Sequence, residues 1–186
     1  MPRAILKRAN PLVARVRILL PYRILQLLCF PLIVFYFLFR LARNRAYRSH
    51  FMERLGFLPQ SFARTAAGSI WLHAVSVGEV ASAVPLLREF RATGRKTDIF
   101  VSTGTLAGRA AAEKQLSGLT EGIFYCPIDF TSCVRRVLKT LRPSLVLVLE
   151  TEIWPNLYAE VKRSGASLAL VNARISNRTW PRYQSM

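Results

Sequence analysis

The sequence IWLHAVSVGE, residues Ile70–Glu79, is typical of a buried strand that leads through a tight turn into a helix. An apolar run from Ile70 to Val75 meets the small turn Ser76-Val77-Gly78, and Glu79 then begins a segment with helical spacing. A strand, a tight turn and a helix with a carboxylate in its first turn commonly form a site at the edge of a parallel sheet. The stretch therefore predicts a parallel sheet and one side of a binding site.

The same pattern continues to the end of the chain, where short apolar runs alternate with segments of helical spacing. The predicted strands are Ile70–Val75, Asp98–Ser102, Gly122–Cys126, Leu145–Leu149 and Ser167–Val171. The predicted helices between them are Glu79–Ala92, Ala107–Leu116, Ser132–Leu141 and Asn156–Arg163. The strands lack polar alternation, as expected when helices cover both faces of a sheet. This order predicts an α/β fold with a Rossmann-like parallel sheet and right-handed crossovers over residues 69–186.

The N-terminal part of the chain differs from this domain in charge and hydropathy. The net charge is +17 over 186 residues, and residues 1–64 alone hold twelve Lys/Arg and one acid, a net +11. Residues 1–23 are a basic segment interrupted by prolines, and residues 24–39 follow without a charge. That run forms a helix of about 24 Å, short of the roughly 30 Å hydrocarbon core, whereas residues 18–39 reach that length. We predict an uncleaved membrane anchor, kinked at Pro31, that either spans the bilayer or lies in its plane. A buried core helix is the alternative.

Residues 40–68 form a basic, aromatic-rich connector, in which we expect a helix over Ala46–Leu55 that ends at Gly56 and lies along the lipid headgroups. A basic excess around an apolar run favours an anionic membrane surface over nucleic acid as partner. The sequence contains no RNP, helix-turn-helix or finger pattern, so we predict no nucleic-acid partner. The three cysteines have no CxxC pairing, which predicts free thiols, most simply as small buried hydrophobes.

Glu79 has two interpretations. Ser76-x-x-Glu79 before an apolar-periodic segment is a capping box, which gives the glutamate a structural role. However, Gly78 leaves space for a ligand, and the position is the carboxyl end of a strand, where parallel sheets bind ligands. A carboxylate there could act as general base on a substrate hydroxyl.

A second acidic motif, Glu150-Thr151-Glu152-Ile153-Trp154-Pro155, follows the predicted strand Leu145–Leu149. Pro155 at the first helical position and one acid near a helix N-terminus are ordinary features. A helix start does not require both acids, so we predict that this motif is the other side of the site. Because no histidine is near and His73 lies inside a strand, we predict no metal site.

Two further strand ends carry weaker signals. The loop Thr103-Gly104-Thr105-Leu106-Ala107-Gly108 leads into a helix, whose free amides could hold a phosphate or carboxylate, although an ordinary βα turn is the better-supported interpretation. The segment Asn172-Ala173-Arg174 could orient a sugar or phosphate, and a surface turn is its alternative.

At these motifs the sequence resembles the N-terminal half of the Kdo (3-deoxy-D-manno-octulosonic acid) transferases of Gram-negative lipopolysaccharide synthesis. The resemblance lies in WLHAVSVGEVASAVPLL (Trp71–Leu87), the Thr-Gly-Thr-x-x-Gly loop, YCPIDF (Tyr125–Phe130), LRPSLVLVLETEIWPNL (Leu141–Leu157) and LVNARIS (Leu170–Ser176). The basic N-terminus and the connector AYRSHFMERLGFLP match as well, so the resemblance covers nearly all of residues 18–186.

This resemblance implies an inverting glycosyltransferase of the GT-B arrangement, without metal or cofactor, at the cytoplasmic face of the bacterial inner membrane. The implied reaction moves Kdo from CMP-Kdo to a lipid A precursor, lipid IVA. Glu79 corresponds to the family's general base, and Glu150 is similar to a transition-state stabiliser. The acceptor-binding residues expected from the strand ends are Ser76, Gly78, Thr103, Gly104, Thr105, Glu152, Trp154, Asn172 and Arg174.

The resemblance also sets an expectation about extent. The family continues into a second, nucleotide-sugar-binding domain, whereas this sequence stops at Met186. We therefore expect the acceptor-binding half of such an enzyme, with anionic membrane lipids and the lipid A precursor as partners. A non-catalytic membrane-bound module that binds lipid or another polyanion is the alternative.

Overall fold

The computed structural model describes residues 11–150 and 152–173. The backbone divides into two units, one ending at Arg40 and one that begins at Leu41 and contains the sheet. Each unit is described by itself.

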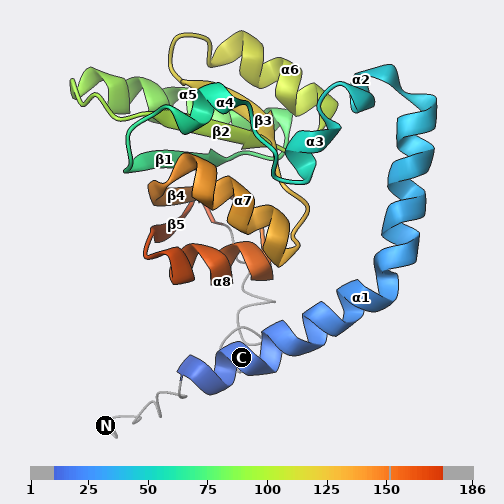
Figure 1. Cartoon of the computed structure of the whole chain (residues 1–186). Coiled ribbons are helices and arrows are strands. Elements are labelled where there is room, and N and C mark those ends of the chain that lie inside the picture. The colour runs from blue at the N-terminus through green and yellow to red at the C-terminus, as the bar shows by residue number, and fades with distance from the viewer. Residues whose placement is uncertain (1–10, 151, 174–186) are drawn as a thin grey trace, which may run out of the picture. The chain divides into compact units, whose positions relative to one another are not determined.

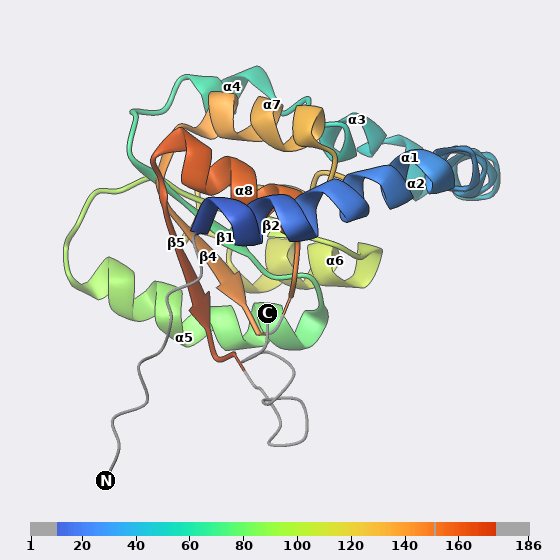
Figure 2. The same ribbon diagram turned by 90° about the horizontal axis from the view of Figure 1, so that it is seen from below.

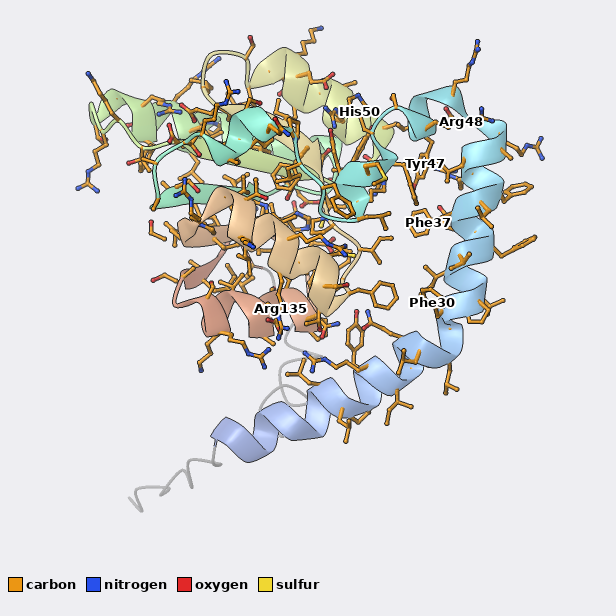
Figure 3. All side chains as sticks on the ribbon, viewed as in Figure 1. Phe30, Phe37, Tyr47, Arg48, His50 and Arg135 are labelled. Atoms are coloured by element: carbon orange, nitrogen blue, oxygen red, sulfur yellow. The ribbon has the colours of Figure 1, made fainter. Side chains whose placement is uncertain are left out.

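The first unit is built on α1 (Pro11–Arg43), a helix of 33 residues. It begins inside the segment that the sequence analysis sets apart as residues 1–23, and Pro21 and Pro31 both lie within it. Figure 1 shows that α1 bends part-way along its length, and Phe30 lies near the bend in Figure 3. Pro31 explains a bend there, because proline removes one helical hydrogen bond and clashes with the carbonyl four residues earlier.

Part of this helix is long and apolar enough to cross a membrane. The segment Leu19–Arg43 has 25 residues and a mean hydropathy of 2.2. Its large apolar side chains are exposed, with Leu27 and Leu28 more than 70% accessible. Signal sequences and the core helices of soluble proteins can have the same length and composition.

The second unit contains a five-stranded parallel sheet in the order β3-β2-β1-β4-β5. The strands are β1 (Ser69–His73), β2 (Ile99–Thr103), β3 (Gly122–Tyr125), β4 (Pro143–Leu149) and β5 (Ser167–Val171). In register, His73 of β1 lies beside Ser102 of β2 on one side and Val148 of β4 on the other. The predicted α/β fold with a parallel sheet is therefore confirmed, and each predicted strand overlaps an observed one.

Helices cover both faces of this sheet (Figures 1 and 2). One face packs against α5 (Val77–Ala92) and α6 (Leu106–Gln115), and the other packs against α4 (Gln60–Ala63), α7 (Thr131–Leu141) and α8 (Pro155–Ser164). Alternate residues of each strand enter the two cores, so Trp71 and Phe100 face α7 and α8 while Leu72 and Val101 face α5 and α6. Coverage of both faces is the reason that the strands show no polar alternation.

The connector differs most from its prediction. The expected helix over Ala46–Leu55 is replaced by two four-residue helices, α2 (Arg45–Arg48) and α3 (Phe51–Arg54), with a turn between them. Glu53 and Arg54 are buried at 6% and 8% exposure, so this part of the connector packs on the sheet unit instead of lying apart from it along headgroups.

Phe62 of α4 completes this packing. Its ring lies 4.9 Å from that of Phe100 and 6.3 Å from that of Phe124, centre to centre. Gly122 makes the room, because a Cβ at that position would lie 2.2 Å from Cζ of Phe62. The connector is thus held by residues of β2 and β3, which lie much later in the sequence. The composition of the connector alone does not indicate these contacts.

Candidate active site

The carboxyl ends of β1 and β4 flank the point where the strand order reverses. From β1 the chain crosses through α5 to β2, and from β4 it crosses through α8 to β5 on the opposite side. Such a reversal leaves a crevice between the two loops, and ligands of doubly wound sheets bind there. The turn that carries Glu79 follows β1, and Glu150 directly follows β4, so the fold brings the two predicted acidic stretches to this one crevice.

The Glu79 carboxylate is held by three donors in the β1–α5 turn. Its Oε2 accepts the backbone N–H of Val75 at 2.8 Å, and its Oε1 accepts the backbone N–H and the hydroxyl of Ser76 at 3.2 and 2.8 Å. Ser76 in turn caps α5, because its hydroxyl oxygen accepts the Glu79 N–H at 3.4 Å. The predicted capping box is therefore present, and it fixes the carboxylate just beyond the carboxyl end of β1, where Glu79 is 4% exposed.

The residues beside this turn leave room for a ligand on one side and pack tightly on the other. A Cβ at Gly78 would meet only the Ser76 hydroxyl, at 3.9 Å. At Gly104, by contrast, a Cβ would lie 2.6 Å from a methyl group of Val75. Gly104 therefore allows the β2–α6 loop to contact the β1–α5 turn, and its N–H donates to the Val75 carbonyl at 3.0 Å.

Glu150 adopts a left-handed backbone conformation with φ 59°, directly after the last residue of β4. A glutamate pays a steric cost in this region, which glycine and asparagine populate far more readily. Such outliers persist where the surrounding structure imposes them, and they concentrate at functional sites. Its N–H donates to the Val171 carbonyl of β5 at 2.8 Å, which fixes the residue against the neighbouring strand.

Glu152 connects the two sides of the crevice electrostatically. Burial raises the pKa of Glu152 above its usual value, and the negative charge of Glu79 raises it further, more strongly than that of Glu150. The indole of Trp154 opposes this shift in pKa, although its N–H does not meet the carboxylate at hydrogen-bonding geometry. The tyrosine hydroxyl of Tyr158 donates to the Glu152 carbonyl and holds this loop against α8.

Neither Glu150 nor Glu152 is needed to cap α8. Pro155 occupies the first turn of that helix, as predicted, and the cap comes from a different loop. The Asp129 carboxylate accepts the N–H groups of Asn156 and Leu157 at 3.0 and 2.8 Å, so it supplies the negative charge that a helix N-terminus favours. The ordinary explanation for an acid near this helix is thus already met by Asp129.

The other predicted site residues are distributed along the same edge of the sheet. Thr105 caps α6 through a hydrogen bond from the Gly108 N–H at 2.9 Å, which matches the ordinary βα turn considered for this loop. Alternation along β2 places Thr103 on the α5–α6 face, fully buried, and its hydroxyl has no partner among the described residues. Asn172 follows β5 with φ 58° and is exposed. Arg174 lies outside the described residues.

Within residues 11–150 and 152–173, no three or more His, Cys, Asp or Glu side chains are grouped as potential ligands of a metal ion.

Comparison with known proteins places the chain in a family. The family model described as 3-deoxy-D-manno-octulosonic-acid transferase (kdotransferase) matches residues 49–186. The chain belongs to the Kdo transferase family. The matched part is the N-terminal domain of these glycosyltransferases.

Curated relatives with this name agree with the match. The chain is 32% identical over 164 residues to a 3-deoxy-D-manno-octulosonic acid transferase of Haemophilus influenzae, covering 87% of the chain and 38% of that protein. It is 30% identical over 166 residues to a probable mitochondrial counterpart in Arabidopsis thaliana, covering 88% of the chain and 36% of that protein. A Bordetella pertussis relative is 35% identical over 132 residues, covering 64% of the chain and 30% of that protein. The chain thus spans less than two fifths of the length of these relatives.

In this Kdo transferase domain, a cluster of buried charge that the sequence did not predict lies beside the β2–α6 loop. Glu53 accepts the Tyr125 backbone N–H at 2.8 Å and pairs with Arg109 at 2.5 Å. Arg54 donates to the Gly104 carbonyl at 2.9 Å and stacks over the rings of Tyr47 and Tyr125, with its guanidinium carbon 4.9 and 4.3 Å from their centres. Tyr47 is labelled in Figure 3, on the segment that leads into α3. The available signal was the Glu-Arg pair itself, set between apolar residues of a basic connector.

A second buried network lies beneath the crevice. The Trp71 indole N–H donates to the Ser102 hydroxyl at 2.8 Å, and that hydroxyl lies 2.8 Å from Nδ1 of His73. Because the Ser102 oxygen accepts a hydrogen bond from Trp71, we assign the Ser102 hydroxyl as the donor to Nδ1 of His73. His73 then carries its proton on Nε2, which lies 3.8 Å from Sγ of Cys126. The His73 ring also contacts Trp154 edge-on at 5.8 Å. His73 is thus a buried core residue, as predicted, and it supports the loop that carries Glu152.

Proposed function

We propose that this chain forms the acceptor-binding side of an inverting glycosyltransferase that moves Kdo from CMP-Kdo to a lipid A precursor, lipid IVA, in lipopolysaccharide synthesis. One observation carries the proposal: in a chain of the Kdo transferase family, two glutamates from separate motifs follow β1 and β4, the two strands at which the order of the sheet reverses. An acceptor hydroxyl is a poor nucleophile near neutral pH, and a fixed carboxylate at the mouth of a crevice supplies what it lacks.

Glu79 is the proposed general base. A carboxylate has about four lone-pair positions, and among the described residues the three donors in the turn leave Oε2 with one partner, the Val75 N–H. Oε2 can therefore accept the proton of the acceptor hydroxyl. As that proton moves, the hydroxyl oxygen forms a bond to the anomeric carbon of Kdo, and the bond from that carbon to the CMP phosphate oxygen breaks. CMP departs with the electron pair, and this single displacement inverts the anomeric centre.

Glu150 is the proposed stabiliser of the transition state. Glycosyl transfer develops positive charge at the anomeric carbon, and an ionised carboxylate that is already oriented stabilises that charge without reorganising. The left-handed backbone at Glu150 and its hydrogen bond to Val171 support this role, because they fix where the side chain begins. The remaining polar residues of the edge, Ser76, Thr103, Glu152, Trp154 and Asn172 among them, are proposed to position the sugar and phosphate groups of the acceptor.

The proposed setting is the cytoplasmic face of a bacterial inner membrane. The apolar segment Leu19–Arg43 would hold the protein there, and the net +11 of residues 1–64 would attract anionic lipids, including the acceptor. The donor CMP-Kdo would bind a second domain of the GT-B arrangement. No metal or cofactor enters the proposed chemistry.

The test measures transfer by the protein expressed from its own gene in membranes, with radiolabelled CMP-Kdo and lipid IVA. Glu79→Gln keeps the capping box through its amide oxygen, since glutamine serves at that position, but it replaces Oε2, the proposed base, with an NH2 group that cannot accept the Val75 N–H. We expect transfer to fall by about 10²–10⁴-fold, together with a loss of about 1–3 kcal/mol in the free energy of unfolding from the unpaired Val75 N–H. Glu89→Gln, an exposed site on the same helix, is the matched control and should leave transfer unchanged. Transfer retained in Glu79→Gln would refute the base assignment, and lipid IVA binding without transfer in the wild type would favour the non-catalytic module.

A further inference from the structure

The connector and the proposed base are joined by an unbroken series of hydrogen bonds. Arg54 donates to the Gly104 carbonyl at 2.9 Å, and the Gly104 N–H donates to the Val75 carbonyl at 3.0 Å. The Val75 N–H then donates to Oε2 of Glu79 at 2.8 Å. Each intermediate residue is held on both sides of its Cα, so a shift of Arg54 is passed to the carboxylate through only two residues.

Arg54 is itself firmly placed. Its exposure is 8%, its guanidinium lies over the rings of both Tyr47 and Tyr125, and its carbonyl accepts the Ile128 N–H at 2.8 Å. A planar guanidinium can stack on aromatic rings while it donates in its own plane, which a lysine ammonium cannot reproduce. The side chain thus has a single geometry and a single backbone acceptor, the loop that contacts the Glu79 turn.

The packing at Gly104 makes this loop a close neighbour of the turn. The loop and the turn meet where a Cβ would come within 2.6 Å of Val75, and at Gly108 a Cβ would lie 2.9 Å from the Val75 carbonyl oxygen. Val75 is therefore confined by the β2–α6 loop on one side and by the Glu79 carboxylate on the other. Because the loop and Val75 are in close van der Waals contact, displacement of the loop must move Val75.

We propose that Arg54 is a positioning residue for Glu79, which sets the orientation of that carboxylate through Gly104 and Val75. The catalytic part of this inference rests on the proposed function, in which Glu79 is the base. Arg54 does not touch the substrate in this account. It fixes the angle at which Oε2 meets the acceptor hydroxyl, and a misplacement of about 1 Å can cost on the order of 10²-fold in rate.

The experiment compares Arg54→Met with Arg136→Met in the membrane-bound protein. Arg136 is the comparison site, because it also donates to a connector carbonyl, that of Leu55 at 2.9 Å, and stacks over Phe57, but it is exposed and makes no hydrogen bond to the β2–α6 loop among the described residues. We expect Arg54→Met to lower kcat by on the order of 10²-fold with little change in KM for CMP-Kdo. Arg54→Lys, which keeps the charge and one donor, should fall between this variant and the wild type. Arg136→Met should affect stability more than kcat.

Two further readouts separate positioning from general destabilisation. In the Glu79→Gln background, Arg54→Met should have no additional effect on residual transfer, because both changes remove the same function. Amide hydrogen exchange at Gly104 and Val75 should lose protection in Arg54→Met and keep it in Arg136→Met. Multiplicative losses, equal kcat losses in the two arginine variants, or unchanged exchange at both amides would overturn the proposal. If Glu79→Gln retains full transfer, the proposed base is wrong, and the exchange measurement alone still decides whether Arg54 orders the Glu79 turn.

Discussion

His73 is a buried histidine, and its burial makes the stability of the domain depend on pH. The residue is fully buried among Trp71, Ser102, Cys126 and Trp154. Burial lowers the pKa of His73 from its usual 6.5 to about 4, and the backbone of Ser102 opposes this shift only in part. The folded protein therefore binds this proton less readily than the unfolded chain.

The sign of the effect follows from linkage. Above pH 6.5 the histidine is neutral in both states and costs nothing, whereas between pH 6.5 and about 4 the unfolded chain gains a proton that the folded protein does not. We expect the free energy of unfolding to fall across that window by on the order of 3 kcal/mol, less whatever relaxation the site allows. Urea unfolding from pH 7.5 to 4 should show a smaller slope in His73→Gln than in the wild type. His50→Gln, which removes the other histidine, should keep the contribution of His73, and equal slopes in wild type and His73→Gln would contradict the assignment.

At the same scale, residue types predicted where Glu79 and Glu150 lie along the chain better than how the structure holds them. The Ser-x-x-Glu spacing predicted the capping box, and the structure contains it. The spacing does not predict the left-handed backbone conformation of Glu150 or the capping of α8 by Asp129. Both depend on loops that meet only in the folded sheet. The sequence thus placed Glu79 and Glu150 at strand ends, while the geometry at those ends came from residues distant in the chain. The proposed catalytic roles of the two glutamates remain predictions.

At the scale of elements, α4 packs against β3 because Gly122, which has no side chain, leaves space for the ring of Phe62. Gly122→Ala would place a Cβ 2.2 Å from Cζ of Phe62, so the ring or the strand must move. We expect a loss of roughly 1–3 kcal/mol in the free energy of unfolding, measured by urea titration. Phe62→Leu in the same protein should recover part of this loss, because the shorter side chain leaves room for the methyl group. Gly118→Ala is no suitable comparison, since its φ of 75° adds backbone strain, and additive losses in the double variant would argue against a direct clash.

The strands and long helices were predictable because each reflects a local rule. Strands covered on both faces appear as continuous apolar runs, and helices between them show a period near 3.6. The connector obeys no such rule. Beside the local contacts with His50 and Tyr47, Glu53 and Arg54 bond to Tyr125, Arg109 and Gly104, and these three partners lie at least 50 positions away in sequence. From the sequence alone, a charged pair in a basic segment is therefore expected to face solvent or lipid headgroups. The contacts that bury the pair become evident only in the folded sheet.

At the scale of the whole molecule, the apolar segment Leu19–Arg43 predicts where the protein resides. We expect the wild type to remain in the membrane pellet after an alkaline wash. Leu27→Lys with Leu28→Lys places two charges in the middle of that segment, each at a cost of about 2.5–3.5 kcal/mol for insertion, and should move the protein to the soluble fraction. Leu27→Ala with Leu28→Ala is the control that keeps the segment uncharged. A product shortened at its N-terminus, seen by mass spectrometry, would instead identify a removed signal sequence.

The long sequence separation of the Glu53 contacts has a consequence for synthesis. Glu53 bonds to Tyr125, 72 positions later in the chain, so its partner does not yet exist when α3 leaves the ribosome. At about 5–20 residues per second, the delay is roughly 4–14 s. The apolar helix and its basic flank are made first and can reach a membrane during that interval, whereas the docking of the connector must await β3. The connector is therefore translated before the strand to which it docks, and it acquires these native contacts only after β3 has been made.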